Sequence, residues 1–189
     1  LIYTSGTTSE PKGVAVSHET VSFTTNNIVN VLQYSDSDID ILPLPLFHSF
    51  GLGCLHTSLC VGSTLVLHKN ASNISGLLDS IKNNNGTTFA AIPATLTKII
   101  DFDNLKDIFS NLRLIITNST SIPLNTISSI RQFLTNGNFF TYYGLTEASR
   151  STFMNFNFTD KKDSSVGQAA PGIELRIINE KNEQDRSGE

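Results

Sequence analysis

Short apolar runs alternate along the chain with longer stretches in which apolar residues recur at helical spacing. Such runs are typical of buried strands, and amphipathic stretches are typical of helices that pack on a sheet. The alternation therefore predicts an α/β fold, with β-sheets flanked by helices. The expected strands cover residues 1–3, 14–16, 39–44, 64–67, 88–92, 112–117 and 139–142, with a more exposed strand at 173–178. The expected helices cover residues 18–31, 50–61, 72–82, 93–100 and 123–134.

Capping residues mark several of the expected helix ends. Ser17 is expected to cap the first helix, and Ser72 the third, because a serine side chain can accept a hydrogen bond from the open N–H groups of a first turn. Gly62 is expected to close the second helix, where a glycine accommodates the left-handed conformation. The pattern thus predicts the residues at which these helices begin and end.

The composition is that of a soluble globular protein, with 39% hydrophobic and 16% charged residues in 189, enough to bury the core of one domain. The formal charge of −4 argues against a nucleic-acid or anionic-membrane surface as the main function. No signal peptide opens the chain and no apolar run approaches the length of a membrane span. Cys54 and Cys60 complete no disulfide framework or metal site. We expect both to be buried free thiols in a cytoplasmic protein.

Both ends of the chain suggest truncation. Leu1 lies inside an apolar run, and Glu189 follows directly after a Ser-Gly turn. Natural domains seldom begin in a strand and stop at a turn. We therefore expect residues 1–189 to be one part of a larger domain.

The loop at residues 4–13 combines small residues, five hydroxyls and one lysine directly after an apolar strand. It can turn successive backbone N–H groups toward an anion, while the hydroxyls and Lys12 supply further donors. It is not a Walker loop, because Lys12 is followed by Gly13 and not by a serine or threonine that opens a helix. A flexible polar linker would explain the small residues but not their combination with a strand and a Pro-Lys-Gly. The loop is predicted to bind phosphates through Thr4, Ser5, Gly6, Thr7, Thr8 and Lys12.

At this point the sequence resembles the adenylate-forming superfamily, which includes acyl-CoA synthetases, aryl-CoA ligases, luciferases and peptide-synthetase adenylation domains. Residues 3–13, Tyr-Thr-Ser-Gly-Thr-Thr-Ser-Glu-Pro-Lys-Gly, match its signature loop. Ser9 replaces a glycine of that signature, and it carries mild strain if the backbone there needs a positive φ. The donors for phosphate survive this change.

Residues 44–52, Leu-Pro-Leu-Phe-His-Ser-Phe-Gly-Leu, are similar to the second block of the family. The resemblance implies that His48 gates the pocket or approaches the substrate carboxylate, whereas a lone histidine is more often a core residue bonded to the backbone. Relatives that activate amino acids place an aspartate near this block to hold the substrate ammonium. This segment has none, which favours a substrate without an α-amino group.

Residues 142–147, Tyr-Tyr-Gly-Leu-Thr-Glu, resemble the Tyr-Gly-x-Thr-Glu block of the family. Taken alone, such a run is more often a turn followed by a helix start. The resemblance implies that Tyr142, Tyr143 and Gly144 contact the nucleotide, with a ring face for adenine. Thr146 would hold the α-phosphate, and Glu147 would supply an oxygen ligand to Mg²⁺. The order and separation of three such blocks carry the resemblance.

Three fainter matches lie elsewhere. Residues 112–123 occupy the place of a strand and an adenine loop, and the resemblance assigns nucleotide contacts to Asn118, Ser119 and Thr120, although relatives are rich in glycine and alanine there. Residues 93–95 lie where relatives line the acyl pocket, and are equally a helix start. Residues 165–172 resemble the block before the family's nucleotide-gripping aspartate, and residues 186–189 the turn that follows; ordinary surface turns explain both as well.

The resemblance implies ATP- and Mg²⁺-dependent activation of a carboxylic acid as an acyl-adenylate, followed by transfer to the thiol of CoA or phosphopantetheine. It covers only part of the large N-terminal domain of such enzymes. Relatives carry a ribose-binding aspartate, a phosphate-binding arginine, a hinge and a small C-terminal lid domain with the adenylation lysine beyond it. Two alternatives stay open: an acyl- or aminoacyl-adenylation domain that serves a carrier protein, and a nucleotide-binding module. We expect residues 1–189 alone to be nearly inactive.

Overall fold

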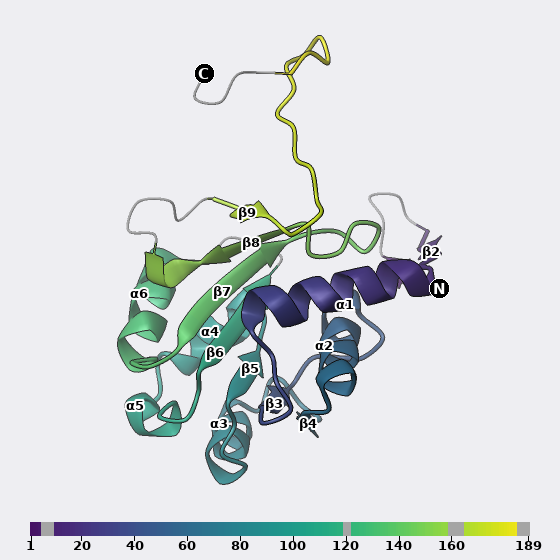
Figure 1. The fold of residues 1–189 in the computed structure, drawn as a ribbon. Coiled ribbons are helices and arrows are strands. Elements are labelled where there is room, and N and C mark those ends of the chain that lie inside the picture. Colours follow the sequence, from purple (N-terminus) through teal and green to yellow (C-terminus); the bar gives the residue numbers. More distant parts are fainter. Residues whose placement is uncertain (5–9, 119–121, 159–164, 185–189) are drawn as a thin grey trace.

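A computed structural model describes residues 1–4, 10–118, 122–158 and 165–184. Within them a seven-stranded sheet has the order β4-β3-β5-β6-β7-β8-β9, and a separate hairpin, β1-β2, lies at the N-terminus (Figure 1). The strands are β1 (Ile2–Thr4), β2 (Lys12–Val14), β3 (Ile39–Leu42), β4 (Thr64–Leu67), β5 (Thr88–Ala90), β6 (Leu114–Asn118), β7 (Asn138–Tyr143), β8 (Thr152–Asn155) and β9 (Gln168–Ala169). The predicted α/β class is confirmed.

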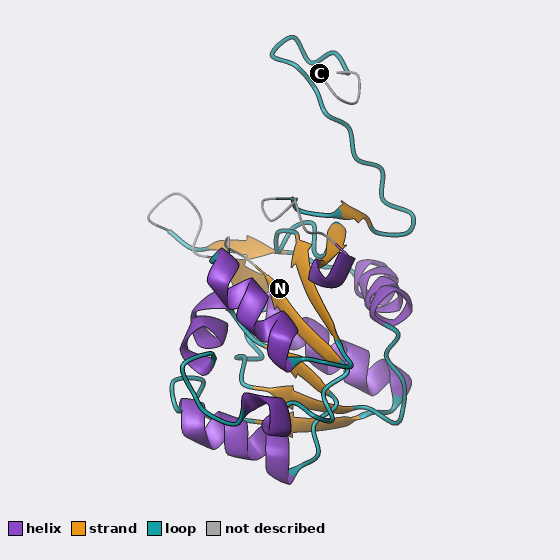
Figure 2. Ribbon diagram, turned by 90° about the vertical axis from the view of Figure 1, so that its left-hand side faces the viewer, coloured by secondary structure: helices purple, strands orange, loops and turns teal. Residues whose placement is uncertain are grey.

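Helices cover both faces of the sheet (Figure 2). They are α1 (His18–Leu32), α2 (Ser49–Val61), α3 (Ile74–Asn83), α4 (Pro93–Ile99), α5 (Leu105–Ile108) and α6 (Leu124–Phe133), with a short 3-10 helix, η1 (Phe156–Phe158). Side chains of α3 to α6 pack in one apolar core, and those of α1 and α2 pack in the other. Neighbouring residues of one strand serve the two cores, because side chains alternate along a strand: Ile41 belongs to the first and Leu42 to the second.

The five strands from β4 to β7 are parallel, and β8 and β9 continue the sheet antiparallel. Parallel strands end at the same edge of a sheet, and ligands of open α/β sheets bind outside that edge. The segments that follow β3, β5 and β7 contain the motifs at 44–52, 93–95 and 144–147. The topology therefore brings motifs that are far apart in the sequence to one edge.

The helix ends follow the capping rules with one correction. Ser17 caps α1, and its Oγ accepts the N–H of Thr20 at 3.1 Å. Gly62 closes α2 in the left-handed conformation, at φ 76°. The expectation that Ser72 caps the third helix is wrong, because Asn73 caps α3 instead, with its Oδ1 accepting the N–H of Gly76 at 3.1 Å. The helix thus begins one residue later than expected, and the side chain of Asn73, which is longer than that of Ser72, reaches the N–H of its first turn.

The amino edge of the parallel strands is held by a buried ion pair. Arg113, just before β6, donates from Nε to Oδ1 of Asp38 at 2.7 Å and from Nη2 to Oδ2 at 2.5 Å. The same guanidinium donates to the carbonyls of Leu32 and Gln33 at the end of α1. Burial alone would raise the pKa of Asp38, but the hydrogen bonds from Arg113 and its neighbours hold this pKa below its ordinary value. The pair links the entrances of two strands to the end of a helix.

Several expected elements differ from the structure. Residues 173–178 form no strand: Leu175 and Ile177 are exposed, and this segment runs away from the body as a single extended strip (Figure 1). An alternating pattern supplies no hydrogen-bonding partner by itself. The expected strand at 14–16 begins and ends earlier, as β2, because Val14 pairs with Ile2. The elements α5 and β8 were not expected: α5 is a single helical turn, and β8 joins the sheet by pairing with β7 and β9.

The two cysteines lie in different surroundings. Cys54 is buried as expected, whereas Cys60 is exposed, which corrects the prediction for the second thiol. Cys60 lies about one and two-thirds helical turns after Cys54, so the two side chains point to different sides of α2. None of the helices that the structure describes is long and apolar enough to cross a membrane.

Candidate functional site

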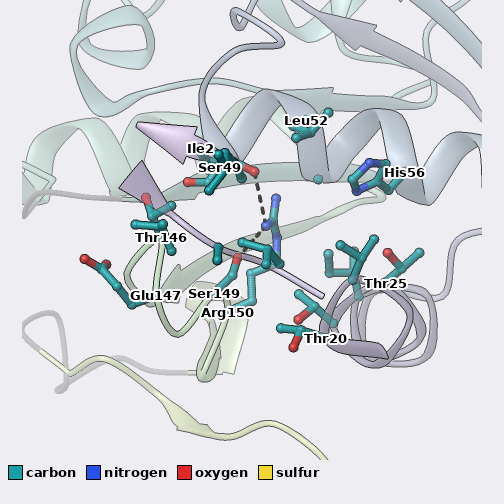
Figure 3. Close-up of a pocket in the computed structure, with 18 residues that line it drawn as sticks. Ile2, Thr20, Thr25, Ser49, Leu52, His56, Thr146, Glu147, Ser149 and Arg150 are labelled. Atoms are coloured by element: carbon teal, nitrogen blue, oxygen red, sulfur yellow. Dashed lines mark hydrogen bonds between the residues drawn. The ribbon is translucent and has the colours of Figure 1, made fainter. Parts of the chain in front are cut away.

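A cavity of about 260 Å³ opens between the N-terminal hairpin, α1, the start of α2 and the segment that follows β7 (Figure 3). Ile2 and Val14 line it from the two strands of the hairpin, and Thr146 and Glu147 line it from the other side. The flanks of the predicted phosphate loop and the predicted nucleotide block therefore share one cavity, although 132 positions separate Val14 from Thr146.

The hairpin positions the predicted phosphate-binding residues. Thr4 pairs with Lys12 across β1 and β2, so these two residues stand opposite each other where the loop leaves the hairpin. The Lys12 side chain is exposed and Thr4 is half-buried. The remaining loop residues of this prediction lie outside the described part of the chain, namely Ser5, Gly6, Thr7, Thr8 and Ser9.

A tight turn after β7 aims Thr146 and Glu147 at the cavity. Leu145 and Ala148 exchange backbone hydrogen bonds of 3.0 and 3.2 Å across the turn. A Cβ at Gly144 would lie 2.4 Å from the nitrogen of Arg150, so a larger residue would displace the turn. Thr146 is half-buried and Glu147 is exposed. This placement puts a hydroxyl and a carboxylate on the cavity wall at the carboxyl edge of the sheet.

Tyr142 and Tyr143 face opposite ways at the end of β7. Tyr142 is buried: its hydroxyl accepts a hydrogen bond from Nδ2 of Asn118 at 2.9 Å, and its ring meets Phe50 edge-on at 5.2 Å. Burial raises the pKa of Tyr142, which keeps its hydroxyl protonated. Tyr143 is 51% exposed. Of the two rings, Tyr143 is therefore the exposed one, while Tyr142 packs against Arg150 behind the cavity wall. Ser119 and Thr120, also expected near adenine, lie outside the described residues.

His48 caps α2. Its Nδ1 accepts the N–H of Phe50 at 3.2 Å, its side chain is exposed, and its neighbour Ser49 lines the cavity. The described histidine that lines the cavity is His56, two turns further along α2. Burial, followed by the charge of Arg150, lowers the pKa of His56, so its imidazole is neutral at physiological pH.

Arg150 forms the floor of the cavity, and the sequence analysis did not identify it. Its side chain is buried, and it donates from Nη2 to the carbonyl of Phe50 at 3.1 Å and from Nη1 to Oγ of Ser149 at 2.9 Å. The guanidinium lies 4.8 Å from the centre of the Tyr142 ring. A single arginine in a polar turn has no periodic pattern that would mark it as functional. The one cue in the sequence is Gly53, a glycine inside an apolar helix, which indicates a close contact there.

Comparison with known proteins gives a consistent result over the whole chain. The model of the AMP-binding enzyme family matches residues 1–189. The mitochondrial medium-chain acyl-CoA ligase of Rattus norvegicus is 30% identical over 187 residues, covering 94% of this chain and 30% of that protein. The 2-succinylbenzoate–CoA ligase of Bacillus subtilis is 30% identical over 178 residues, covering 94% of this chain and 36% of that protein.

Solved structures share the fold. The O-succinylbenzoate Coenzyme A synthetase of Bacillus subtilis, in complex with ATP and magnesium ion, matches with a TM-score of 0.85 and 27% identity, covering 100% of this chain and 38% of that one. The chain thus spans about a third of the length of the curated relatives it matches, and it corresponds to part of the N-terminal domain of adenylate-forming enzymes. Because the family model covers every residue of it, the chain belongs to the AMP-binding enzyme family.

Proposed function

We propose that the full-length protein uses ATP to activate a carboxylic acid as an acyl-adenylate and then transfers the acyl group to the thiol of CoA. The shared cavity carries this proposal, because it joins the flanks of the phosphate loop to Thr146 and Glu147. Family membership supports the first step, and the curated relatives are themselves named as CoA ligases, which supports CoA over a carrier protein as the acceptor.

The chemistry of the first step is a displacement at phosphorus. An oxygen of the substrate carboxylate attacks the α-phosphorus of ATP, the bond from that phosphorus to the bridging oxygen breaks, and pyrophosphate leaves. The protein contributes position and charge rather than covalent chemistry. Lys12 and the loop between β1 and β2 would hold the β- and γ-phosphates, and the hydroxyl of Thr146 would donate to the α-phosphate, where charge develops in the transition state.

The described residues fit a magnesium ion that is carried mainly by the nucleotide. They contain no cluster of three metal-ligating side chains, whereas Mg²⁺ in phosphoryl-transfer sites usually takes one or two carboxylates together with substrate phosphates and water. Glu147 is the one acidic residue among the described residues that line the cavity. It would hold the ion, and the bound ion would neutralise charge on the phosphates.

The substrate is proposed to lack an α-amino group. The segment at 44–52 contains no acidic residue, and a substrate ammonium in the cavity would meet only Glu147 among the described lining residues, which is already assigned to the metal. We propose that the full-length protein is located in the cytosol.

Pyrophosphate exchange by the full-length protein tests this function. Lys12→Ala and Glu147→Ala should each lower acid-dependent exchange by about 100-fold, the scale on which one electrostatic contact to a transition state acts. Lys106→Ala on α5 and Glu180→Ala remove equally exposed charges away from the cavity and should leave the exchange rate within about twofold of the wild type, since substitutions at such surface sites are usually near neutral. Wild-type exchange in both Lys12→Ala and Glu147→Ala would refute the assignment.

A further inference from the structure

Arg150 is a buried cation that has no counter-ion among the residues that the structure describes. Its side chain is 5% exposed, and it forms no ion pair with any residue that the structure describes. Buried charges in proteins are normally paired, because desolvating a lone charge is costly. Two groups near Arg150 that could become negatively charged stay neutral, since burial raises the pKa of the Cys54 thiol to about 12 and also raises that of Tyr142. The positive charge is therefore not balanced within the described fold.

The guanidinium also has donors to spare. Of its five N–H groups, three have oxygen acceptors in the described residues: the carbonyls of Ser49 at 3.5 Å and Phe50 at 3.1 Å, and Oγ of Ser149 at 2.9 Å. All three acceptors are neutral. Figure 3 shows the guanidinium between Ser49 and Ser149, projecting into the middle of the cavity. The guanidinium also forms a side-chain hydrogen bond with the Cys54 thiol, a weak and neutral acceptor. The described residues offer no further oxygen acceptor to the remaining N–H donors.

The surrounding fold holds this side chain in one place. A Cβ at Gly53 would lie 2.2 Å from Nη2 of Arg150, so any larger residue at this position of α2 would displace the guanidinium. The Tyr142 ring lies against its other side, at 4.8 Å. Arg150 itself has a left-handed backbone, at φ 55°, which a residue with a long side chain rarely adopts. The left-handed backbone of Arg150 and the space that Gly53 leaves for its guanidinium are typical of a preorganised binding group.

The wall around Arg150 offers donors and little negative charge. His56 and the hydroxyls of Thr20 and Thr25 line the same part of the cavity, and Glu147 lies at the other end, beside Thr146 (Figure 3). The reacting carboxylate belongs beside Thr146 and Glu147 in the proposed function. A second anion would meet Arg150 and His56 instead.

We propose that the acid activated by this enzyme carries a second carboxylate, and that Arg150 recognises it as a specificity-determining residue. This inference rests on the proposed function and names its substrate class as short dicarboxylic acids. The second carboxylate would supply the counter-ion that Arg150 lacks among the described residues, in a charge-assisted hydrogen bond of the kind that an arginine favours.

The test compares each straight-chain dicarboxylic acid from malonate to adipate with its monomethyl ester, which keeps the size but removes one charge. Pyrophosphate exchange by the full-length enzyme gives kcat/KM for both. The wild type should prefer the best diacid over its ester by about 10- to 100-fold, the scale of hydrogen bonds to a charged group. Arg150→Met should bring this ratio close to one, and Arg150→Lys should give an intermediate ratio, because an ammonium keeps the charge but not the planar fork.

Two further variants test whether a change in the diacid-to-ester ratio is specific to the position of the Arg150 guanidinium. Gly53→Ala should also lower the ratio, because its methyl group displaces the guanidinium, and Arg176→Met, an exposed arginine outside the cavity, should keep the wild-type ratio. Circular dichroism melting checks that each variant is folded. A wild-type ratio of one or less, or an unchanged ratio in Arg150→Met, overturns the inference while the proposed function stands. Absence of exchange with every acid, monocarboxylic acids included, refutes the proposed function and the inference with it.

Discussion

Two arginines at opposite edges of the parallel strands show how differently the same side chain is used. Arg113, at the amino edge, has a bidentate carboxylate partner in Asp38. Arg150, beyond the carboxyl end of β7, has only neutral acceptors among the described residues. Among the described residues, the charge of Arg113 is balanced by a carboxylate and the charge of Arg150 is not. The first arginine stabilises the fold, and the second is kept for a ligand.

The difference follows from the topology. Loops at the carboxyl edge of a parallel sheet extend beyond the strands and are free to carry binding residues, whereas the amino edge must satisfy its own polar groups. Arg113 accordingly also satisfies the last carbonyls of α1. At the other edge, the carbonyls that Arg150 contacts belong to the first turn of α2, which lines the cavity.

The largest expected effect separates the two arginines by stability. Arg113→Met leaves the Asp38 carboxylate buried without its partner, and we expect the free energy of unfolding to fall by about 3 kcal/mol, at the lower end for a broken buried pair because Arg113 is partly exposed. Arg150→Met breaks no ion pair among the described residues, and it should cost about 1 kcal/mol for lost hydrogen bonds and packing. Urea denaturation of both full-length variants measures the contrast. Equal losses would show that Arg150 is as structural as Arg113.

The next effect is the pH dependence of the unfolding free energy that Asp40, on the amino side of β3, produces. Asp40 is fully buried, and its Oδ1 accepts a hydrogen bond from Thr88 at 2.8 Å. Burial, together with the charge of Asp38, raises the pKa of Asp40 from 3.8 to about 6. The folded state therefore holds this proton more tightly than the unfolded state, so the contribution to stability is full below about pH 4 and is lost as the pH rises through 6.

Asp40→Asn removes this titration. Relative to the wild type, the variant should gain about 2 to 3 kcal/mol between pH 4 and pH 8, since one pKa unit corresponds to about 1.4 kcal/mol. Urea unfolding at pH 4 and pH 8 measures the difference in unfolding free energy between the variant and the wild type. Any cost of the asparagine that does not depend on pH cancels when the two differences are subtracted. Asp38→Asn is the matched comparison: its pKa is lowered, so its contribution is present above pH 4 and lost in acid. A difference between wild type and Asp40→Asn that does not change with pH would contradict this account.

The fold was largely predictable because local chemistry agrees with it. Ser17 and Gly62 mark helix ends that the structure confirms, since caps act through neighbouring residues. The strand expected at 173–178 failed for the opposite reason: a strand needs a partner, and no local pattern supplies one. The single turn of α5 is too short to show a helical period, and β8, like any strand, depends on its partners, here β7 and β9.

The candidate site was predictable only where the resemblance supplied motifs. It indicated Thr146 and Glu147, and the structure places both on the cavity wall. Arg150 and His56 were missed, because their significance depends on what packs around them, namely a glycine in α2 and a buried ring at the end of β7. Those contacts are long-range. They become visible only when the sheet brings both segments to one edge.

The smallest expected effect concerns His48, the N-cap of α2, whose first carbonyls accept hydrogen bonds from Arg150. His48 accepts the N–H of Phe50, whose carbonyl in turn accepts from Arg150. His48→Ala should lower the unfolding free energy by about 0.5 kcal/mol, because the cap is exposed, and His48→Asn should restore it, since asparagine is a strong N-cap.

The same two variants separate capping from substrate contact. If His48 acts through the cap alone, exchange activity and the preference for diacids follow stability, and both return in His48→Asn. A loss of exchange that persists in a stable His48→Asn would instead show that the imidazole itself contacts the substrate, as the resemblance implies. In that case the carboxyl edge holds a second functional side chain on α2, and the contrast with the amino edge becomes sharper, because the residue that fixes the helix also takes part in binding.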